Sequence, residues 1–402
     1  MKATLGEACL FYSGTGFPEI YQGISEGEFP FFKVSDISSN VSEGNTYLER
    51  CANYVSTDVV NTIHGTIIPP DTVVFAKIGE ALKKNRRAIT VQRSLVDNNA
   101  MGILPRKELL RIKYFYYFMC RLQMEKYAEA TAVPSVRKSR LEQIYIEIPS
   151  IDEQIHIEKM FDTISSIIKA RQRQLLTLDT LIKARFVEMF GDPIRGTSFE
   201  VKKLRDVSES ISDGSNVDKK YYRSSGDVLF LRIQNVWFNE FRLEDSAFIS
   251  DEVNQQYYDT SLNHGDLLIT KIGRFYTPDS SLGRVSVYLG KDDKANYSNN
   301  IMRVRLTQNV HYEFINALMN LDDYNKYIRR VSVGGTDKRA LSKSIIGDLP
   351  IVVPPFDMQM VFVEFVHQID RSKIIIQKAF EETQLLFDSL MQKYFGEVET
   401  CN

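Results

Sequence analysis

The sequence repeats itself with a period close to 200 residues, so one folding plan occurs twice. Phe32–Ile37 (FKVSDI) is echoed by Leu231–Val236 (LRIQNV), and Val74–Gly79 (VFAKIG) by Leu268–Gly273 (LITKIG). These pairs differ in number by 199 and 194, whereas every match from Pro149 to Gly191 differs by 205. Loops of variable length therefore precede a segment whose length is fixed, and that segment constrains the fold most.

Two long helices account for this fixed segment. Gln154 to Gly191 and Gln359 to Gly396 each span 37 steps, and neither stretch contains an internal Gly or Pro. Pro149 and Pro354 disfavour helix before each stretch, while Asp152 and Asp357 can cap its first turn. Glycine ends both stretches. We expect two uninterrupted helices of equal length, each about 58 Å long.

Both helices carry an apolar stripe in steps of three and four, which is a coiled-coil seam. The residues expected to pair the helices or dock a partner are Ile157, Phe161, Ile164, Ile168, Leu175, Ile182, Phe362, Val366, Ile369, Ile376, Phe380 and Phe387. An antiparallel pair within the chain, with pseudo-two-fold symmetry and one globular half at each end, buries both stripes. The alternative is that each helix packs on its own domain.

The remaining segments are two β-rich domains, residues 1–150 and 193–355. Short apolar runs such as FPFFKV and DTVVFAKI alternate with Gly, Asn and Pro turns, and helical periodicity follows around 109–129 and 312–330. The expected fold is α+β and internally duplicated. Its four parts are the domain 1–150, the central helix 151–192, the domain 193–355 and the C-terminal helix 356–402.

Composition narrows the function classes. The net charge is −2, divided as +2, −1, +1 and −4 over the same four segments, so no global basic field attracts nucleic acid. The chain has no apolar run long enough for a membrane span and no signal peptide at its start, which favours a cytoplasmic protein. Its four cysteines and five histidines are scattered, and neither a disulfide framework nor a metal site is expected.

No catalytic constellation stands out. Val353–Phe356 (VPPF) has the Pro-Pro-aromatic pattern of amino-methyltransferases but lacks the preceding polar residue that would accept from an amine. Asp192, Glu200 and Lys202 imitate a metal-dependent nuclease, yet they straddle a helix end and a domain start, where a linker explains them. We therefore expect a binding protein, not an enzyme, with no cofactor.

Basic residues cluster at two places in each half, after the Lys-Ile-Gly turn and before the last strand. The candidate DNA-binding residues are Lys77, Lys83, Lys84, Arg86, Arg87, Arg137, Lys138, Lys271, Arg274, Arg284, Lys338 and Arg339. Such side chains bind phosphates and, in the case of arginine, guanine edges. A solvated charged surface is the alternative for any one cluster, and recurrence in both halves favours DNA binding.

The helix entrances IPSIDEQ and LPIVVPPFDMQ, the helix end LIKARFVEMFGDP and the restart EVKKLRDV together resemble type I restriction-modification specificity subunits. The resemblance covers essentially the whole chain. It implies two target-recognition domains that each read half of a split double-stranded DNA site. It also implies that the helices are a spacer and a docking surface for two modification (methyltransferase) subunits, with restriction subunits joining the assembly. Met358, which stands where the first half has Glu153, departs from the pattern.

Three alternatives stay open. The same architecture occurs in specificity subunits whose partner fuses nuclease and methylase. From a different class, the chain can be a coiled-coil scaffold that binds proteins and not DNA. A self-sufficient methyltransferase would need an S-adenosylmethionine site, which the sequence does not reveal.

Overall fold

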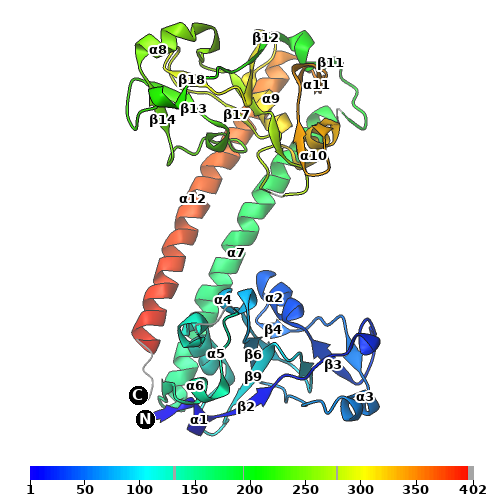
Figure 1. Cartoon of the computed structure of the whole chain (residues 1–402), viewed down its shortest axis with the longest axis vertical. Helices are drawn as coiled ribbons and strands as arrows, with labels where there is room; N and C mark the ends of the chain where they lie inside the picture. The colour runs from blue at the N-terminus through cyan, green and yellow to red at the C-terminus, as the bar shows by residue number, and fades with distance from the viewer. Residues whose placement is uncertain (130–132, 193, 278, 397–402) are drawn as a thin grey trace. The chain divides into compact units, whose positions relative to one another are not determined.

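The computed structural model describes residues 1–129, 133–192, 194–277 and 279–396 (Figure 1). Pro193, Glu397 and the rest of the C-terminal segment after Gly396 lie outside the described residues. The chain divides into two compact units. Unit 1 is Met1–Arg173 together with the chain from Ile376, and unit 2 is Gln174–Ile375. Each unit thus contains one globular α+β part and a segment of each long helix.

A five-stranded sheet with the order β2-β9-β6-β7-β4 lies at the centre of unit 1, beside a three-stranded sheet β5-β3-β8 and the pair β1-β10. The strands are β1 (Lys2–Thr4), β2 (Cys9–Ser13), β3 (Phe29–Phe32), β4 (Tyr47–Leu48), β5 (Tyr54–Val55), β6 (Val73–Ala76), β7 (Arg87–Thr90), β8 (Leu95–Val96), β9 (Ala100–Pro105) and β10 (Tyr145–Glu147). The helices are α1 (Leu5–Ala8), α2 (Val34–Ser42), α3 (Thr57–Thr62), α4 (Glu80–Lys83), α5 (Ile112–Arg121) and α6 (Lys138–Glu142), with short 3-10 turns at Glu19–Tyr21 and Met124–Tyr127.

Strand β6 is an unbroken apolar run because both faces of its sheet are covered. Val73 and Phe75 point into a core that contains Phe115 of α5, whereas Val74 points into a smaller core with Ile37 of α2. The alternation of side chains along the strand thus fills two cores from one sheet. The helical periodicity expected around 109–129 corresponds to α5 and the turn that follows it.

Unit 2 repeats this plan around a sheet with the order β12-β19-β15-β17, with two three-stranded sheets, β14-β13-β18 and β16-β21-β20, and the pair β11-β22. Its strands are β11 (Val201–Lys203), β12 (Ser208–Asp213), β13 (Val228–Leu231), β14 (Ala247–Ile249), β15 (Leu267–Thr270), β16 (Ile272–Arg274), β17 (Val285–Val287), β18 (Ala295–Tyr297), β19 (Ile301–Leu306), β20 (Val333–Gly334), β21 (Lys338–Ala340) and β22 (Pro350–Val352). Its helices are α8 (Asp251–Gln256), α9 (Tyr312–Met319), α10 (Asp322–Val331) and α11 (Lys343–Gly347), with 3-10 turns at Leu204–Val207, Lys219–Tyr221, Ile233–Asn235 and Tyr258–Thr260.

The two long helices are α7 (Ile151–Phe190) and α12 (Phe356–Phe395), and both are unbroken for 40 residues, as Figure 1 shows. The prediction of two uninterrupted helices of equal length is confirmed. Its physical basis is the absence of any internal Gly or Pro, together with Gly191 and Gly396, both at positive φ, directly after each helix.

The helices pair antiparallel in each unit. In unit 1 the ring of Phe161, near the start of α7, lies 5.3 Å from that of Phe387 and 5.8 Å from that of Phe395, near the end of α12. In unit 2 the ring of Phe186 lies 5.3 Å from that of Phe362. Phe161 and Phe362 are also part of the two main domain cores. Helix pairing and packing on a domain, written above as alternatives, therefore occur together.

All twelve seam residues are at least half-buried. Five are buried, namely Ile157, Phe161, Ile164, Phe362 and Ile369. The other seven are half-buried, namely Ile168, Leu175, Ile182, Val366, Ile376, Phe380 and Phe387. The seam is thus covered largely by the chain itself.

A buried glutamine anchors the start of each long helix by the same hydrogen bonds. Gln154 accepts a hydrogen bond from the Arg111 amide (2.8 Å) and donates to the carbonyls of Leu109 (2.9 Å) and Pro149 (3.1 Å). Gln359 accepts from the His311 amide (2.9 Å) and donates to the carbonyls of Asn309 (3.2 Å) and Pro354 (2.9 Å). Both side chains are fully buried. One residue per long helix thus ties that helix to the loop that leads into an earlier helix of the same domain, α5 or α9.

The helix entrances differ at the residue that breaks the sequence pattern. Glu153 accepts hydrogen bonds from the Ser150 amide (3.0 Å) and hydroxyl (2.8 Å), and these bonds lower the pKa of Glu153. The second entrance has Pro355 and Met358 at the matching positions, so this capping box cannot form there. Met358 instead packs against the apolar core of unit 2.

Replacing Gln154 with leucine should destabilise unit 1 by roughly 3 kcal/mol, because three buried backbone groups lose their partner. Gln172, an exposed glutamine of the same helix, provides the matched control, and Gln172→Leu should leave stability within about 0.5 kcal/mol. Urea unfolding of the full chain, followed by circular dichroism, measures both variants. Equal midpoints for Gln154→Leu and the unaltered chain would contradict the anchoring role.

Candidate nucleic-acid interface

The repeated Lys-Ile-Gly turns lie at equivalent places and make equivalent hydrogen bonds. The amide of Lys77, after β6, donates to the Asn99 carbonyl (2.8 Å), and the amide of Lys271, after β15, donates to the Asn300 carbonyl (2.9 Å). The two lysine carbonyls in turn accept from the amides of Val136 (2.9 Å) and Leu341 (2.8 Å). In both units the second basic segment is therefore brought beside the first.

In unit 2 this pairing builds a small basic surface. Strand β16 pairs antiparallel with β21, so that Arg274 lies opposite Lys338 and Gly273 opposite Arg339. Arg274 and Lys338 border a hollow of about 400 Å³ whose lining also includes Ile233, Ile272, Asn300 and Ser281. The guanidinium of Arg339 stacks 4.0 Å from the ring centre of Phe275. Apolar and basic side chains from three separate stretches of the sequence thus meet at this surface.

In unit 1 the equivalent contact is shorter. Ile78 bridges Ser135, as Ile272 bridges Ala340, so Ser135 is the counterpart of Ala340. Arg137 consequently matches Ser342, and both are the N-cap residues of the next helix. The two basic loops therefore do not match residue by residue, because Arg137 and Lys138 lie further along the repeat than Lys338 and Arg339.

The basic residues of unit 1 differ in what they contact. Arg137 pairs with Glu129 at 2.7 Å, Lys138 with Glu142 at 3.5 Å and Lys83 with Glu80 at 2.7 Å, all near the surface. Lys84 is exposed, and Lys77 is half-buried. Exposed ion pairs of this kind contribute little to stability, so these side chains can turn toward a phosphate at small cost.

Arg87 and Arg284 do not belong to the surface, and we correct their prediction as DNA contacts. Arg87 is 1 % exposed, and its guanidinium donates to the Leu122 carbonyl (2.7 Å) and the Asn85 side chain (2.8 Å). Burial lowers the pKa of Arg87 to about 10, which leaves it protonated at neutral pH. Arg284 is 4 % exposed and donates to the Ser280 carbonyl (3.0 Å). Both guanidinium groups satisfy carbonyls of the protein itself.

Arg86 is the counterpart of Arg284 and likewise binds a carbonyl of the protein, but Arg86 is half-buried whereas Arg284 is buried. Its guanidinium donates to the Ser38 carbonyl (3.1 Å), as that of Arg284 donates to the Val236 carbonyl (3.4 Å), just after the repeated FKVSDI and LRIQNV segments. The guanidinium of Arg284 also stacks on Trp237, 3.6 Å from its ring centre. The guanidinium of Arg242 lies 3.4 Å from the same ring centre. Apart from the single tryptophan, no feature of the sequence predicts this stack.

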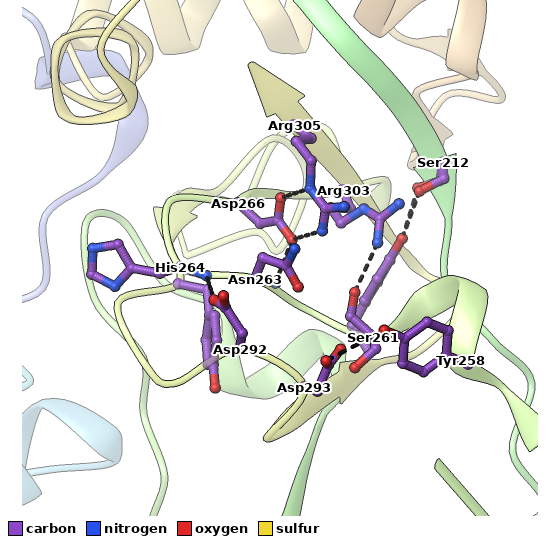
Figure 2. Close-up of polar contacts among 12 residues, drawn as sticks. Ser212, Tyr258, Ser261, Asn263, His264, Asp266, Asp292, Asp293, Arg303 and Arg305 are labelled. Atoms are coloured by element: carbon purple, nitrogen blue, oxygen red, sulfur yellow. Dashed lines mark hydrogen bonds and ion pairs between the residues drawn. The ribbon is translucent and has the colours of Figure 1, made fainter. Parts of the chain in front are cut away.

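A second set of arginines in unit 2 binds groups of the protein itself, as the dashed lines in Figure 2 show. Arg305 forms two hydrogen bonds with the buried Asp266 carboxylate (2.8 and 2.7 Å), and Arg303 donates to the Ser261 carbonyl (2.8 Å). Asp266 also accepts from the Asn263 amide (2.7 Å), which fixes the turn before β15. These residues hold the strand that presents Lys271, and they are not candidates for DNA contact.

Lys271 differs from its counterpart Lys77 in its partner. Its ammonium group forms an ion pair with Asp213, at the end of β12. Asp213 pairs with Met302 as Ser13 pairs with Met101, so unit 1 has serine where unit 2 has this carboxylate. Asp213 therefore neutralises the charge of Lys271 in unit 2, whereas Ser13 does not neutralise the charge of Lys77 in unit 1.

Among the described residues, no group of three or more His, Cys, Asp or Glu side chains is arranged to hold a metal ion. No helix within the described part of the chain is long and apolar enough to cross a membrane.

The family model for the type I restriction modification DNA specificity domain matches residues 4–178 and again residues 197–385. The chain belongs to this specificity family. The two matches coincide with the two halves of the duplication, which confirms the internally duplicated architecture with a long helix between the two domains.

Relatives of the family resemble the chain along most of its length. It is 23 % identical to the type I restriction enzyme MjaIX specificity subunit of Methanocaldococcus jannaschii, over 92 % of this chain and 87 % of that protein. The crystal structure of a type I restriction-modification S subunit from M. genitalium matches with a TM-score of 0.54 and 13 % identity, over 99 % of this chain and 96 % of that one. A chain of another type I R-M structure matches with a TM-score of 0.59 and 16 % identity, over 98 % and 96 %. These structures share the fold.

Arg87→Ala should destabilise unit 1 of this specificity protein by roughly 3 kcal/mol, because the Leu122 carbonyl loses its buried donor. Lys84→Ala, three residues earlier and exposed, should change stability by less than about 0.5 kcal/mol. Thermal unfolding of the two variants checks the contrast. If Arg87→Ala unfolds like the unaltered chain and only loses DNA affinity, its assignment to the interior is wrong.

Proposed function

We propose that the chain reads a bipartite double-stranded DNA site, one half with each domain, and docks two modification subunits together with restriction subunits. The observation that carries this proposal is the duplicated pairing of a Lys-Ile-Gly turn with a second basic segment, which occurs in both units. Two equivalent readers in one chain suit a site made of two parts. In this proposal the domains are 1–150 and 193–355, and the helical segments are 151–192 and 356–402.

DNA contact is supported by the side chains that remain available. Lys84, Arg137, Lys138, Arg274 and Lys338 are exposed at the paired segments. Side chains of this type bind backbone phosphates, and phosphate contacts position a protein on DNA without reading its sequence. The net charge of −2 supplies no long-range attraction, so we expect the partner subunits to contribute much of the affinity.

Docking of two partners is supported by apolar residues that the seam leaves uncovered. Leu181 of α7, in unit 2, and Leu386 of α12, in unit 1, are 43 % and 51 % exposed. They differ in number by 205, the offset of the duplicated helices, so each unit presents the same apolar position. Exposed leucines that recur at equivalent positions fit two copies of one partner.

We assign no catalysis and no cofactor to this chain, and place methyl transfer and DNA cleavage in the partners. The assembly would act in the cytoplasm, where chromosomal DNA lies. Co-expression with the neighbouring methylase, followed by the mass of the complex and the methylation pattern of genomic DNA, tests the proposal. Two methylases per chain and a split methylated motif are expected. A partner that also cleaves DNA would favour the fused system, and association without a motif would favour a protein-binding scaffold.

Each docking position should control one partner. Leu386→Asp or Leu181→Asp should reduce the complex by one modification subunit, and the double variant by both, because a charge would have to be buried at the contact. Leu386→Met and Leu181→Met keep the apolar surface and should assemble normally. Native mass spectrometry measures the composition. Two bound subunits in the double aspartate variant would contradict this docking surface; Phe161→Asp is unsuitable, since Phe161 is buried in a domain core.

Replacing Lys77 should weaken binding to the half-site that unit 1 reads. Lys77→Ala removes a charge that Ser13 does not balance, so we expect a several-fold loss of affinity and a salt dependence shallower by about one ion. The neutral double replacement Asp213→Ala with Lys271→Ala should change affinity less than about twofold, because the pair has no net charge. Fluorescence anisotropy at several salt concentrations measures both. Equal losses would show that Lys271 contacts DNA despite its ion pair.

A further inference from the structure

The most exposed paired strands of unit 2 form a basic ribbon that the fold itself does not require. It consists of β16, β21 and β20, with the turn Gly335–Asp337 between the last two. Both residues of β20 are exposed, and Val333 has 58 % of its surface open to solvent. A Cβ at Gly335 would meet no atom within 4 Å. The strand β20 itself carries no charge, and the charged residues lie beside it on β16 and β21.

Charge and shape of this ribbon suit DNA. Arg274, Lys338 and Arg339 are its cations and Asp337 its single acid, which leaves a net charge of +2. Arg274 and Lys338 are directly opposed across the strands, so their side chains lie on one face about 5 Å apart at the root. At the level of Arg274 and Lys338 the ribbon is two strands wide, because β20 pairs with β21 at Arg339 and Ala340. A two-stranded ribbon fits the major groove, which is about 12 Å wide.

The root of the ribbon is held firmly, as accurate base reading requires. The Phe275 amide donates to the Asp337 carbonyl (2.8 Å), and Arg339 stacks on the Phe275 ring. On the other side, Arg284 donates to the Ser280 carbonyl, and the Ser281 hydroxyl donates to the Ile272 carbonyl (2.6 Å). The carboxylate of Asp337 lies 3.6 Å from the guanidinium of Arg274, and both groups are exposed. Fixed backbone and free side-chain ends thus occur together.

The corresponding part of unit 1 has different chemistry. From the shared register, Val133 stands where unit 2 has Lys338, and Glu80 stands where it has Arg274. Neither can donate a side-chain hydrogen bond to a guanine. If the ribbon reads bases, the two half-sites must therefore be read by unlike chemistry.

We propose that the β16–β21–β20 ribbon enters the major groove of the half-site read by unit 2, where Arg274 and Lys338 donate hydrogen bonds to N7 and O6 of guanine. This inference rests on the proposed function and assigns its base-reading residues in one half. An arginine or lysine that contacts the N7 and O6 edge distinguishes guanine from every other base.

The test uses the assembled complex with its methylase and the motif found by methylation mapping. Guanines are replaced with 7-deazaguanine, which lacks the N7 acceptor, in one half-site at a time. Inosine, which lacks the minor-groove amino group, serves as the groove control. We expect 7-deazaguanine to lower affinity roughly tenfold in one half-site only, and inosine there to have little effect.

The variants Arg274→Ala and Lys338→Ala should lose affinity for the normal duplex and bind the 7-deazaguanine duplex no more weakly than the normal one. Lys294→Ala, an exposed lysine of unit 2 outside the ribbon, should keep the full difference between the two duplexes. Intact methylase binding by all variants shows that they fold and assemble.

Several results would overturn the inference while leaving the proposed function intact. One is a split motif in which one half lacks a G·C pair and the other half shows no effect of 7-deazaguanine, and another is 7-deazaguanine without effect in either half. A third is an Arg274→Ala variant that still discriminates 7-deazaguanine as strongly as the unaltered chain, which would make Arg274 a phosphate contact. Loss of methylase binding by Arg274→Ala or Lys338→Ala would assign the ribbon to a protein partner. Absence of any motif would instead refute the proposed function.

Discussion

Each domain core of this chain is completed by segments that are distant in the sequence. In unit 1, Phe161 from the start of α7 packs with Phe387 and Phe395 from the end of α12. In unit 2, Phe186 from the end of α7 packs with Phe362 from the start of α12. Aromatic side chains dominate the energetics of a core because of their large buried area. Neither core is therefore complete without both long helices, and the rest of the structure depends on this shared packing.

The shared packing explains why the duplication is strict in one place and loose in another. One added residue in a helix rotates everything after it by about 100°, which would turn Phe190 or Phe395 away from its core. One added residue in a surface loop costs only a fraction of a kcal/mol. The offset of 205 is constant from Pro149 to Gly191 because an inserted residue would rotate the helix. Before Pro149 the offset drifts between 194 and 201 because surface loops tolerate insertions. The buried Gln154 and Gln359 fix the register at the start of each long helix, where the loops of variable length end.

Sequence reasoning succeeded where a single segment carries its own signal. The helix bounds follow from prolines, glycines and a stripe that belong to the helix itself, and the domain plan follows from the repeat. It failed where the environment comes from another element. Arg87 and Lys84 look alike in the sequence, yet only Arg87 meets the Leu122 carbonyl from the end of α5. The register of Arg137 against Ser342 likewise depends on the bridge between Ile78 and Ser135, which composition does not reveal. Burial and register are long-range properties, and they decided which predicted contacts remain at the surface.

The two units keep one scaffold while they change its surface chemistry. Lys77 and Lys271 hold the same backbone hydrogen bonds, but Ser13 stands beside one and Asp213 beside the other. Backbone contacts position a protein on DNA, and side chains on base edges specify the sequence. A duplicated backbone can thus keep both domains in the same relation to their helices, since Gln154 and Gln359 are buried and tied to main-chain atoms. Exposed positions such as Arg274 and Glu80 are free to differ because no core packing depends on them. Under the proposed function, that division would let one chain recognise two unlike half-sites without two unlike folds.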